Sequence, residues 1–190
     1  MDKLKVGFAL TGSFCTFEKA ICQIEYFVTQ GADVLPIMSF NAYDIDTRFG
    51  EAETFRNRIE SITGNKIIAS IKDAEPIGPK NLIDIMVVLP CTGNTLAKLA
   101  QGIYDTPVTL AVKSHLRNQK SVVIGVSTND ALSNTAKNIG VLLNYKHYYF
   151  IPMTQDDPDK KPFSIVCDFG RAYETVEYAL QGKQIEPIII

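Results

Sequence analysis

The sequence lacks long apolar runs and has no strong excess of charge of either sign. Its 190 residues carry a net charge of −2, with 46% hydrophobic and 21% charged residues, as in ordinary globular domains. Such a balance gives no electrostatic reason to expect nucleic acid or an anionic membrane as a partner. The apolar segments 6–10 and 188–190 are too short for a secretion signal or a membrane span. We therefore expect a cytoplasmic protein.

Cysteine pairs and metal-binding patterns are also missing. The four cysteines are widely spaced and form no CxxC pair, so free thiols in a reducing compartment are expected rather than disulfides. The carboxylates at 156–159 do not have the spacing of a calcium-binding loop. The sequence therefore predicts no metal site.

Two nucleotide-binding fingerprints are absent. The chain contains neither G-x-G-x-x-G nor G-x-x-x-x-G-K-[ST], which argues against a standard NAD domain and against a P-loop NTPase. No internal repeat and no linker divides the chain. Its length suits one domain over residues 1–190 with a sizeable core.

Apolar segments alternate with helical patterns along the whole chain. The main strand-like segments lie at 4–10, 33–38, 83–89, 121–126 and 147–151, with shorter ones at 67–69 and 164–167. Apolar stripes with helical spacing lie between them, as in Leu96, Leu99 and Ala100. This order predicts a single-domain α/β protein with three layers, α/β/α, and a doubly wound, mostly parallel sheet of the flavodoxin or Rossmann type. Residues 151–163 are expected to form a loop or lid, and 183–190 a C-terminal tail.

Four turns at the carboxyl ends of predicted strands are rich in small polar residues. In doubly wound sheets ligands bind at this edge. A helix cap alone explains any one such turn, but four on one edge favour a phosphate-bearing ligand held by hydroxyls and backbone N–H groups rather than by lysines. The candidate binding residues are Thr11, Gly12, Ser13, Ser39, Cys91, Thr92, Gly93, Asn94, Ser127 and Thr128.

The segments 7–13 (GFALTGS) and 90–102 (PCTGNTLAKLAQG), with Ser39 between them, resemble the homo-oligomeric flavin-containing cysteine decarboxylase superfamily. This superfamily includes phosphopantothenoylcysteine decarboxylase and the flavin prenyltransferases, and the resemblance covers about residues 4–145. It implies an FMN-binding fold and a trimer-based homo-oligomer. It also implies that residues 11–13 contact the flavin, that Ser39 helps to hold the phosphate, and that 91–94, Ser127 and Thr128 lie along the ring.

The segment 150–162 resembles one branch of this superfamily, the flavoprotein-like subunits of a two-subunit oxidoreductase. That resemblance implies a second, NAD(P)-type subunit, a small dicarboxylate substrate and a place in the mother cell of a sporulating bacterium. Two alternatives stay open. One is an FMN-dependent decarboxylase or flavin prenyltransferase, and the other is a non-catalytic scaffold with an inherited nucleotide pocket.

Two departures from the decarboxylases speak against their reaction. The decarboxylases carry a catalytic histidine shortly after the second strand, whereas residues 41–64 contain none. Residues 127–133 read STNDALS, in place of the signature Pro-x-Met-Asn-x-x-Met. The sequence therefore predicts no decarboxylation by the family mechanism, and it identifies no catalytic residue.

Three further groups allow a structural as well as a functional interpretation. His115 lies among basic residues that would suit a dicarboxylate, although a solvated helix end is the commoner explanation of such a run. His147 is expected at a strand edge. Cys15 lies near a helix N-terminus, where a thiolate is favoured, but with no base nearby we expect a packed thiol.

Overall fold

The computed structural model describes residues 3–190, which form one sheet of seven strands flanked by helices. The strand order is β2-β1-β3-β4-β7-β6, and β5 pairs with β4. The strands are β1 (Lys5–Leu10), β2 (Asp33–Met38), β3 (Ile85–Cys91), β4 (Val122–Thr128), β5 (Tyr148–Phe150), β6 (Met153–Gln155) and β7 (Ile165–Cys167). The first five pair in parallel, and β6 and β7 are antiparallel. The predicted single-domain, mostly parallel α/β fold is confirmed.

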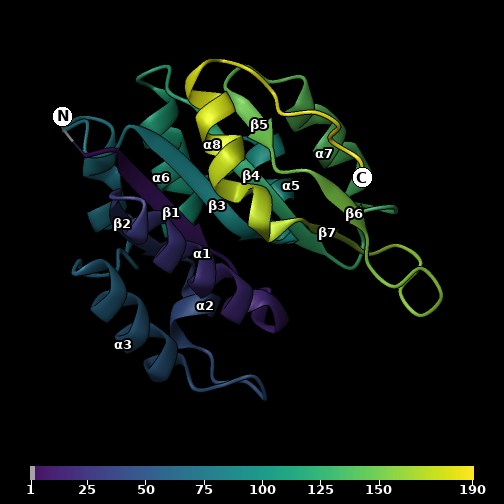
Figure 1. Ribbon diagram of the computed structural model, residues 1–190, viewed down its shortest axis with the longest axis horizontal. Helices are drawn as coiled ribbons and strands as arrows, with labels where there is room; N and C mark the ends of the chain where they lie inside the picture. The colour runs from purple at the N-terminus through teal and green to yellow at the C-terminus, as the bar shows by residue number, and fades with distance from the viewer. Residues whose placement is uncertain (1–2) are drawn as a thin grey trace.

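Helices cover both faces of the sheet (Figure 1). The helices are α1 (Phe17–Thr29), α2 (Phe40–Asp44), α3 (Ala52–Thr63), α4 (Ile71–Ala74), α5 (Gly93–Gln101), α6 (Pro107–Leu116), α7 (Ala136–Leu143) and α8 (Ala172–Leu180). Helix α1 contacts α3 and α8, while α5 contacts α6 and α7. Between these two layers β3 is buried along its entire length, as expected of a parallel strand covered on both faces.

Glycine ends two of these helices. Helix α5 is followed by Gly102 at φ 69° and α3 by Gly64 at φ 68°, the left-handed conformation that glycine adopts without steric cost. Asn65, which follows Gly64, donates to the Val34 carbonyl near the start of β2 at 2.8 Å, so α3 ends at the amino edge of the sheet. The polar turns lie at the opposite, carboxyl edge.

The central strand runs further than predicted. The sequence places its end at residue 89, with Pro90 and Cys91 in the turn, but β3 includes both residues. Its pairing with β4 shifts register between Val88 and Cys91, and such an irregularity redirects the end of a strand. The Cys91 side chain therefore lies in the core and not in the turn.

The segment 151–163 is a loop only in part. Its first residues form β6, which pairs antiparallel with β7 in a hairpin. The tail at 183–190 is also tied to the sheet: Met153 N donates to the Ile188 carbonyl at 2.8 Å, and Ile190 N donates to the Met153 carbonyl at 3.1 Å. Short strands flanked by proline and acidic residues give too weak a pattern for prediction. The segment 67–69 contributes one bridge, between Ile68 and Ile37.

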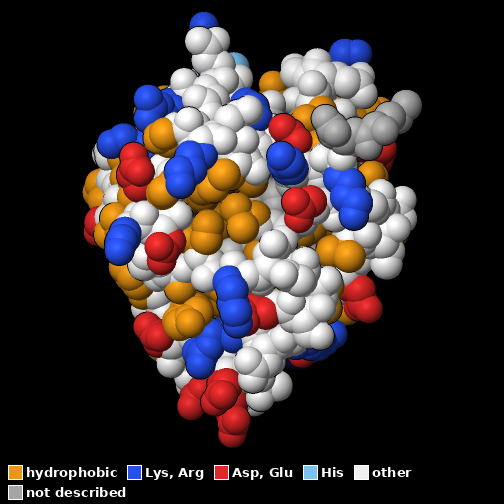
Figure 2. All heavy atoms as spheres, turned by 90° about the vertical axis from the view of Figure 1, so that its left-hand side faces the viewer, with side chains coloured by type: hydrophobic (Ala, Val, Ile, Leu, Met, Phe, Trp, Pro, Cys, Tyr) orange, Lys and Arg blue, Asp and Glu red, His pale blue; other side chains and the backbone are white. Residues whose placement is uncertain are grey.

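The surface on the side of β2 and α3 carries acidic and basic side chains in mixture, with an apolar patch between them (Figure 2). No helix within residues 3–190 is long and apolar enough to cross a membrane.

Candidate functional site

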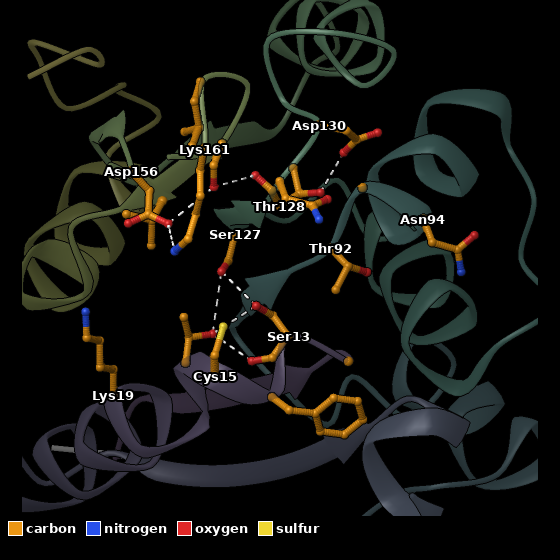
Figure 3. Close-up of a pocket in the computed structure, with 18 of the residues that line it drawn as sticks. Ser13, Cys15, Lys19, Thr92, Asn94, Ser127, Thr128, Asp130, Asp156 and Lys161 are labelled. Carbon is orange, nitrogen blue, oxygen red and sulfur yellow. Dashed lines mark hydrogen bonds and ion pairs between the residues drawn. The ribbon is translucent and has the colours of Figure 1, made fainter. Parts of the chain in front are cut away.

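A pocket of about 880 Å³ opens at the carboxyl edge of the sheet (Figure 3). Its volume is within the range of small-molecule sites. Its walls come from the turns after β1, β3 and β4, from residues 48–49, and from the β6–β7 hairpin. The lining residues are Gly12, Ser13, Phe14, Cys15, Thr16, Lys19, Arg48, Phe49, Thr92, Gly93, Asn94, Ser127, Thr128, Asn129, Asp130, Asp156, Lys161, Ser164, Ile165 and Val166.

The structure brings most of the sequence-predicted binding residues together in this pocket. They are Gly12, Ser13, Thr92, Gly93, Asn94, Ser127 and Thr128. Thr11, Ser39 and Cys91 do not line it. The assignment of all ten residues to a cofactor remains a prediction.

Thr11 holds two turns together instead of facing the pocket. It is buried, and its Oγ1 donates to the Pro90 carbonyl at 2.8 Å while accepting from Thr92 N at 3.0 Å. Because these bonds join the end of β1 to the end of β3, Thr11 fixes the spacing of the two turns that carry the predicted ligand contacts.

Cys91 and Ser39 lie outside the pocket for different reasons. The Cys91 side chain is fully buried, and burial raises the pKa of its thiol, so it is a packed, protonated group. Ser39 caps α2 by accepting from Ala42 N at 3.4 Å. A side chain added at Gly12 would contact Asn41 Cβ at 3.7 Å, which places the 39–41 turn beside the pocket at Gly12.

A hydroxyl cluster forms the side of the pocket between β1 and β4. Ser13 Oγ and Ser127 Oγ are 2.9 Å apart, and Thr16 Oγ1 donates to the Ser13 carbonyl at 2.8 Å. One serine donates to the other, so one serine hydroxyl hydrogen of this pair remains available. The cluster can therefore donate a hydrogen bond to an acceptor in the pocket.

The turn after β3 starts α5. Thr92 is its N-cap, with Oγ1 accepting from Thr95 N at 3.4 Å. The first backbone N–H groups of the helix have no partner within it. Gly93 and Asn94 at this helix start line the pocket.

Asp130 lines the pocket next to the start of α5. From the sequence it could be recognised only as part of the turn after β4. Thr128 Oγ1 donates to its Oδ1 at 2.6 Å, and Thr135 Oγ1 donates to its Oδ2 at 2.7 Å. A Cβ at Gly93 would lie 2.7 Å from Asp130 Oδ1. Glycine at this position therefore makes room for a carboxyl group at the start of α5.

Sequence reasoning also missed three basic residues that line the pocket, Lys19, Arg48 and Lys161. Lys161 pairs with Asp156 at 2.8 Å, and this ammonium lowers the pKa of the Asp156 carboxyl. Within residues 3–190, neither Lys19 nor Arg48 has a carboxylate within 4.0 Å. One of them could have been found from the sequence: Lys19 lies in the first turn of α1, shortly after residues 11–13, which were predicted to bind the ligand.

Apolar side chains complete the pocket. Phe14, Phe49, Ile165 and Val166 line it, and the Arg48 guanidinium lies 4.9 Å from the centre of the Phe49 ring. Polar donors next to apolar surface are typical of sites for ring-containing ligands. Hydroxyls and basic side chains suit a phosphate, and the apolar residues suit a ring, so the residues present fit a flavin nucleotide.

Two interpretations of single residues are corrected by the structure. His115 is buried, and its Nε2 donates to the Ser121 carbonyl at 3.0 Å, so it is neither a solvated helix end nor a dicarboxylate ligand. Burial lowers its pKa to about 4. Cys15 is exposed and lines the pocket, so the expected packed thiol is wrong. No group of His, Cys, Asp or Glu within the described residues could hold a metal ion.

Comparison with known proteins places the chain in a family. Residues 1–181 match the Flavoprotein family. The chain belongs to this family. It is 46% identical over 186 residues to the B subunit of dipicolinate synthase from Bacillus subtilis (strain 168), and the match covers 98% of this chain and 93% of that protein. The resemblance inferred from 7–13, 90–102 and 150–162 is confirmed.

Solved structures agree with the assignment of this chain to the Flavoprotein family. The crystal structure of the dipicolinate synthase B subunit from Bacillus halodurans C has a TM-score of 0.91 and 44% identity, covering 100% of this chain and 98% of the other. The FMN-dependent cysteine decarboxylase SpaF has a TM-score of 0.67 at 21% identity, with 94% and 95% covered. At that identity the second likeness shows the fold alone.

Proposed function

We propose that this chain is the B subunit of a dipicolinate synthase and works with an NAD(P)-type dipicolinate synthase A subunit in the mother cell of a sporulating bacterium. The observation that carries the proposal is the 46% identity to the Bacillus subtilis B subunit over 98% of this chain. The proposed reaction oxidises a dihydrodipicolinate-type precursor, a small dicarboxylate, to dipicolinate. A hydride passes to NAD(P)⁺ and a proton is released.

The proposed roles of the two subunits follow from a motif that this chain lacks. It has no G-x-G-x-x-G fingerprint, so the nicotinamide that accepts the hydride would come with the A subunit. This chain would then complete or support the shared active site. The polar tip of the β6–β7 hairpin, residues 156–164, is the proposed contact with the A subunit, because it projects beyond the sheet next to the pocket (Figure 1).

FMN is the proposed ligand of the pocket. The donor set supports this: Lys19 and Arg48, which have no carboxylate partner within residues 3–190, suit a phosphate, the Ser13–Ser127 hydroxyl pair can donate a hydrogen bond to the ligand, and Phe14 and Ile165 suit a ring. When bound, FMN supplies a second acceptor for electrons. The role of this chain's residues is to bind and orient the ligand and to shield it from water.

A homo-oligomer is part of the proposal. The pocket lies at the carboxyl edge of the sheet, and an apolar patch is exposed on the β2 side of the molecule (Figure 2). Exposed apolar patches commonly mark contacts between proteins. A trimer-based assembly, as the family resemblance implies, would let a neighbouring copy close part of each site.

The alternatives have less support. A decarboxylase or flavin prenyltransferase rests on 33% identity over only 57% of this chain to a coenzyme A biosynthesis bifunctional protein, and on fold likeness at 21% identity or below, while residues 41–64 hold no histidine. A scaffold with an inherited pocket is compatible with the same whole-chain match, but it gives the donors and apolar residues of the pocket no function. A decarboxylase does not explain that match.

Mixing the two subunits tests the proposal. Formation of dipicolinate is followed by absorbance for this chain alone, for the A subunit alone and for the mixture. We expect little activity from this chain alone and strong NAD(P)-linked activity from the mixture. Shortening the hairpin at 157–160, which spares the pocket-lining Lys161, should abolish the mixed activity and leave FMN binding intact. Full activity of the A subunit alone, unchanged by this chain, would refute the proposal.

A further inference from the structure

We propose that Asp130 is a flavin-binding residue that accepts a hydrogen bond from the imide N–H of the ring. This inference rests on the proposed FMN binding and adds the residue that reads one edge of the ligand. Nothing in the sequence pattern singled out Asp130. It lines the pocket on the side of Gly93 and Thr128, two residues that the family resemblance places along the ring.

The carboxyl group is held in a built site. Thr128 donates to one oxygen at 2.6 Å and Thr135 to the other at 2.7 Å. Thr135 is buried, so the carboxyl is anchored from the protein side. Figure 3 shows Asp130 beside Thr128 at the margin of the pocket. A side chain fixed by two hydrogen bonds loses little further freedom when a ligand binds.

Glycine at position 93 is part of this site. A Cβ there would lie within 2.9 Å of Asp130 Oδ1, Thr135 Oγ1 and Thr128 Oγ1. All three atoms therefore pack against the bare backbone at the start of α5. Because Gly93 has no side chain, the carboxyl of Asp130 and the two threonine hydroxyls that hold it occupy this space.

The cluster of Asp130, Thr128 and Thr135 can still accept hydrogen bonds, but it has no hydroxyl hydrogen left to donate. A carboxylate has about four lone-pair positions, and the two threonines use two of them. The hydroxyl hydrogen of Thr128 is spent on Asp130, so Thr128 Oγ1 can also only accept from a ligand. This wall therefore suits a donor, and the imide N–H is the hydrogen-bond donor of the flavin ring itself.

The same carboxyl disfavours phosphate at this point. A helix N-terminus normally attracts an anion, but at α5 a carboxyl of the protein already lies next to Gly93. The phosphate is therefore expected on the other side of the pocket, toward Gly12 and Ser39. The ring then extends from there toward Asp130.

The experiment compares FMN with FMN methylated at the imide nitrogen, which has the same charge and lacks the N–H. Dissociation constants are measured by flavin fluorescence for the wild-type protein, Asp130→Ala and Asp73→Ala. Asp73 is the matched control, because its carboxyl also accepts from a hydroxyl, that of Ser70 at 2.6 Å, and it does not line the pocket. Since a hydrogen bond to a carboxylate is lost on methylation, the wild type and Asp73→Ala should prefer FMN by about 10-fold or more.

In Asp130→Ala this preference should fall to within about twofold, while methylated FMN still binds, which also shows that the variant is folded. Asp130→Asn keeps the side-chain volume and an uncharged acceptor, so its preference for FMN over methylated FMN should lie between those of the wild type and Asp130→Ala. An unchanged preference in Asp130→Ala, or none in the wild type, would overturn the inference and leave FMN binding in place. A wild type that binds neither flavin would overturn the proposed FMN binding as well.

Discussion

Replacing Gly93 by alanine tests whether the Asp130 cluster is built as tightly as the structure indicates. The added methyl would lie 2.7 Å from Asp130 Oδ1, 2.8 Å from Thr135 Oγ1 and 2.9 Å from Thr128 Oγ1. Real Cβ atoms do not approach other atoms this closely, so at least one of the three groups must move. Moving any of them breaks a hydrogen bond to the Asp130 carboxyl.

Two opposing effects set the size of the change. A hydrogen bond to a charged group contributes about 1.5–3 kcal/mol. Alanine in place of glycine inside a helix gains up to about 1 kcal/mol, and less at the first helical position. Because the lost bond outweighs the helix propensity, Gly93→Ala should lower the free energy of unfolding by about 1–2 kcal/mol.

Urea unfolding of four variants checks the value. Gly140→Ala in α7 is the control, because a Cβ there meets nothing within 4 Å; it should stabilise the protein by about 0.5–1 kcal/mol. In the Asp130→Ala background the nearest obstacle is gone, so Gly93→Ala should cost at least about 1 kcal/mol less than in the wild type. A stabilising Gly93→Ala, or equal costs in both backgrounds, would refute the close packing at this site.

Three further predictions concern the ligand, the core and the assembly. Ser39→Ala should weaken FMN binding by about 1.5–2 kcal/mol, the lower part of the range for one hydrogen bond to a charged group, and equal affinity in a fluorescence titration would contradict a phosphate contact. Burial holds the pKa of His115 near 4, below its ordinary 6.5; the unfolded chain therefore binds the extra proton first, and stability should fall as the pH drops from 6.5 toward 4. At pH 5 this loss should be about 2 kcal/mol relative to pH 7 in urea unfolding, and should disappear in His115→Gln. Light scattering with FMN present should give a homo-oligomer, and a monomer would contradict the trimer-based assembly.

Most of the fold could be predicted because its parallel strands are apolar on both faces. Strand β2 begins and ends where the pattern places it. Strand β7 lies within the short strand predicted at 164–167, but β6, and with it the hairpin, was missed because β6 has only three residues. A two-residue period cannot be recognised in so short a segment, and its flanks (prolines and acidic residues) are those of a loop.

The candidate site could be predicted only at the level of turns. Thr11 and Thr128 are both threonines at the carboxyl end of a strand, and the sequence does not distinguish them. Thr11 gives its hydroxyl hydrogen to Pro90 and is buried, whereas Thr128 gives its hydrogen to Asp130 at the pocket wall. The difference depends on partners 79 residues away in one case and two residues away in the other.

The charged residues of the pocket show the same limit more strongly. Lys19, Arg48, Asp130 and Lys161 come from four separate segments and meet only in the folded chain. Each by itself is an ordinary surface residue in the sequence, and a charge on a helix or loop is usually solvated. Their grouping follows from topology, since β1, β3 and β4 are neighbours in the sheet and all end at one edge. A cation side and an acceptor side then lie across one pocket, which favours a ligand with an anionic group at one end and a ring N–H at the other.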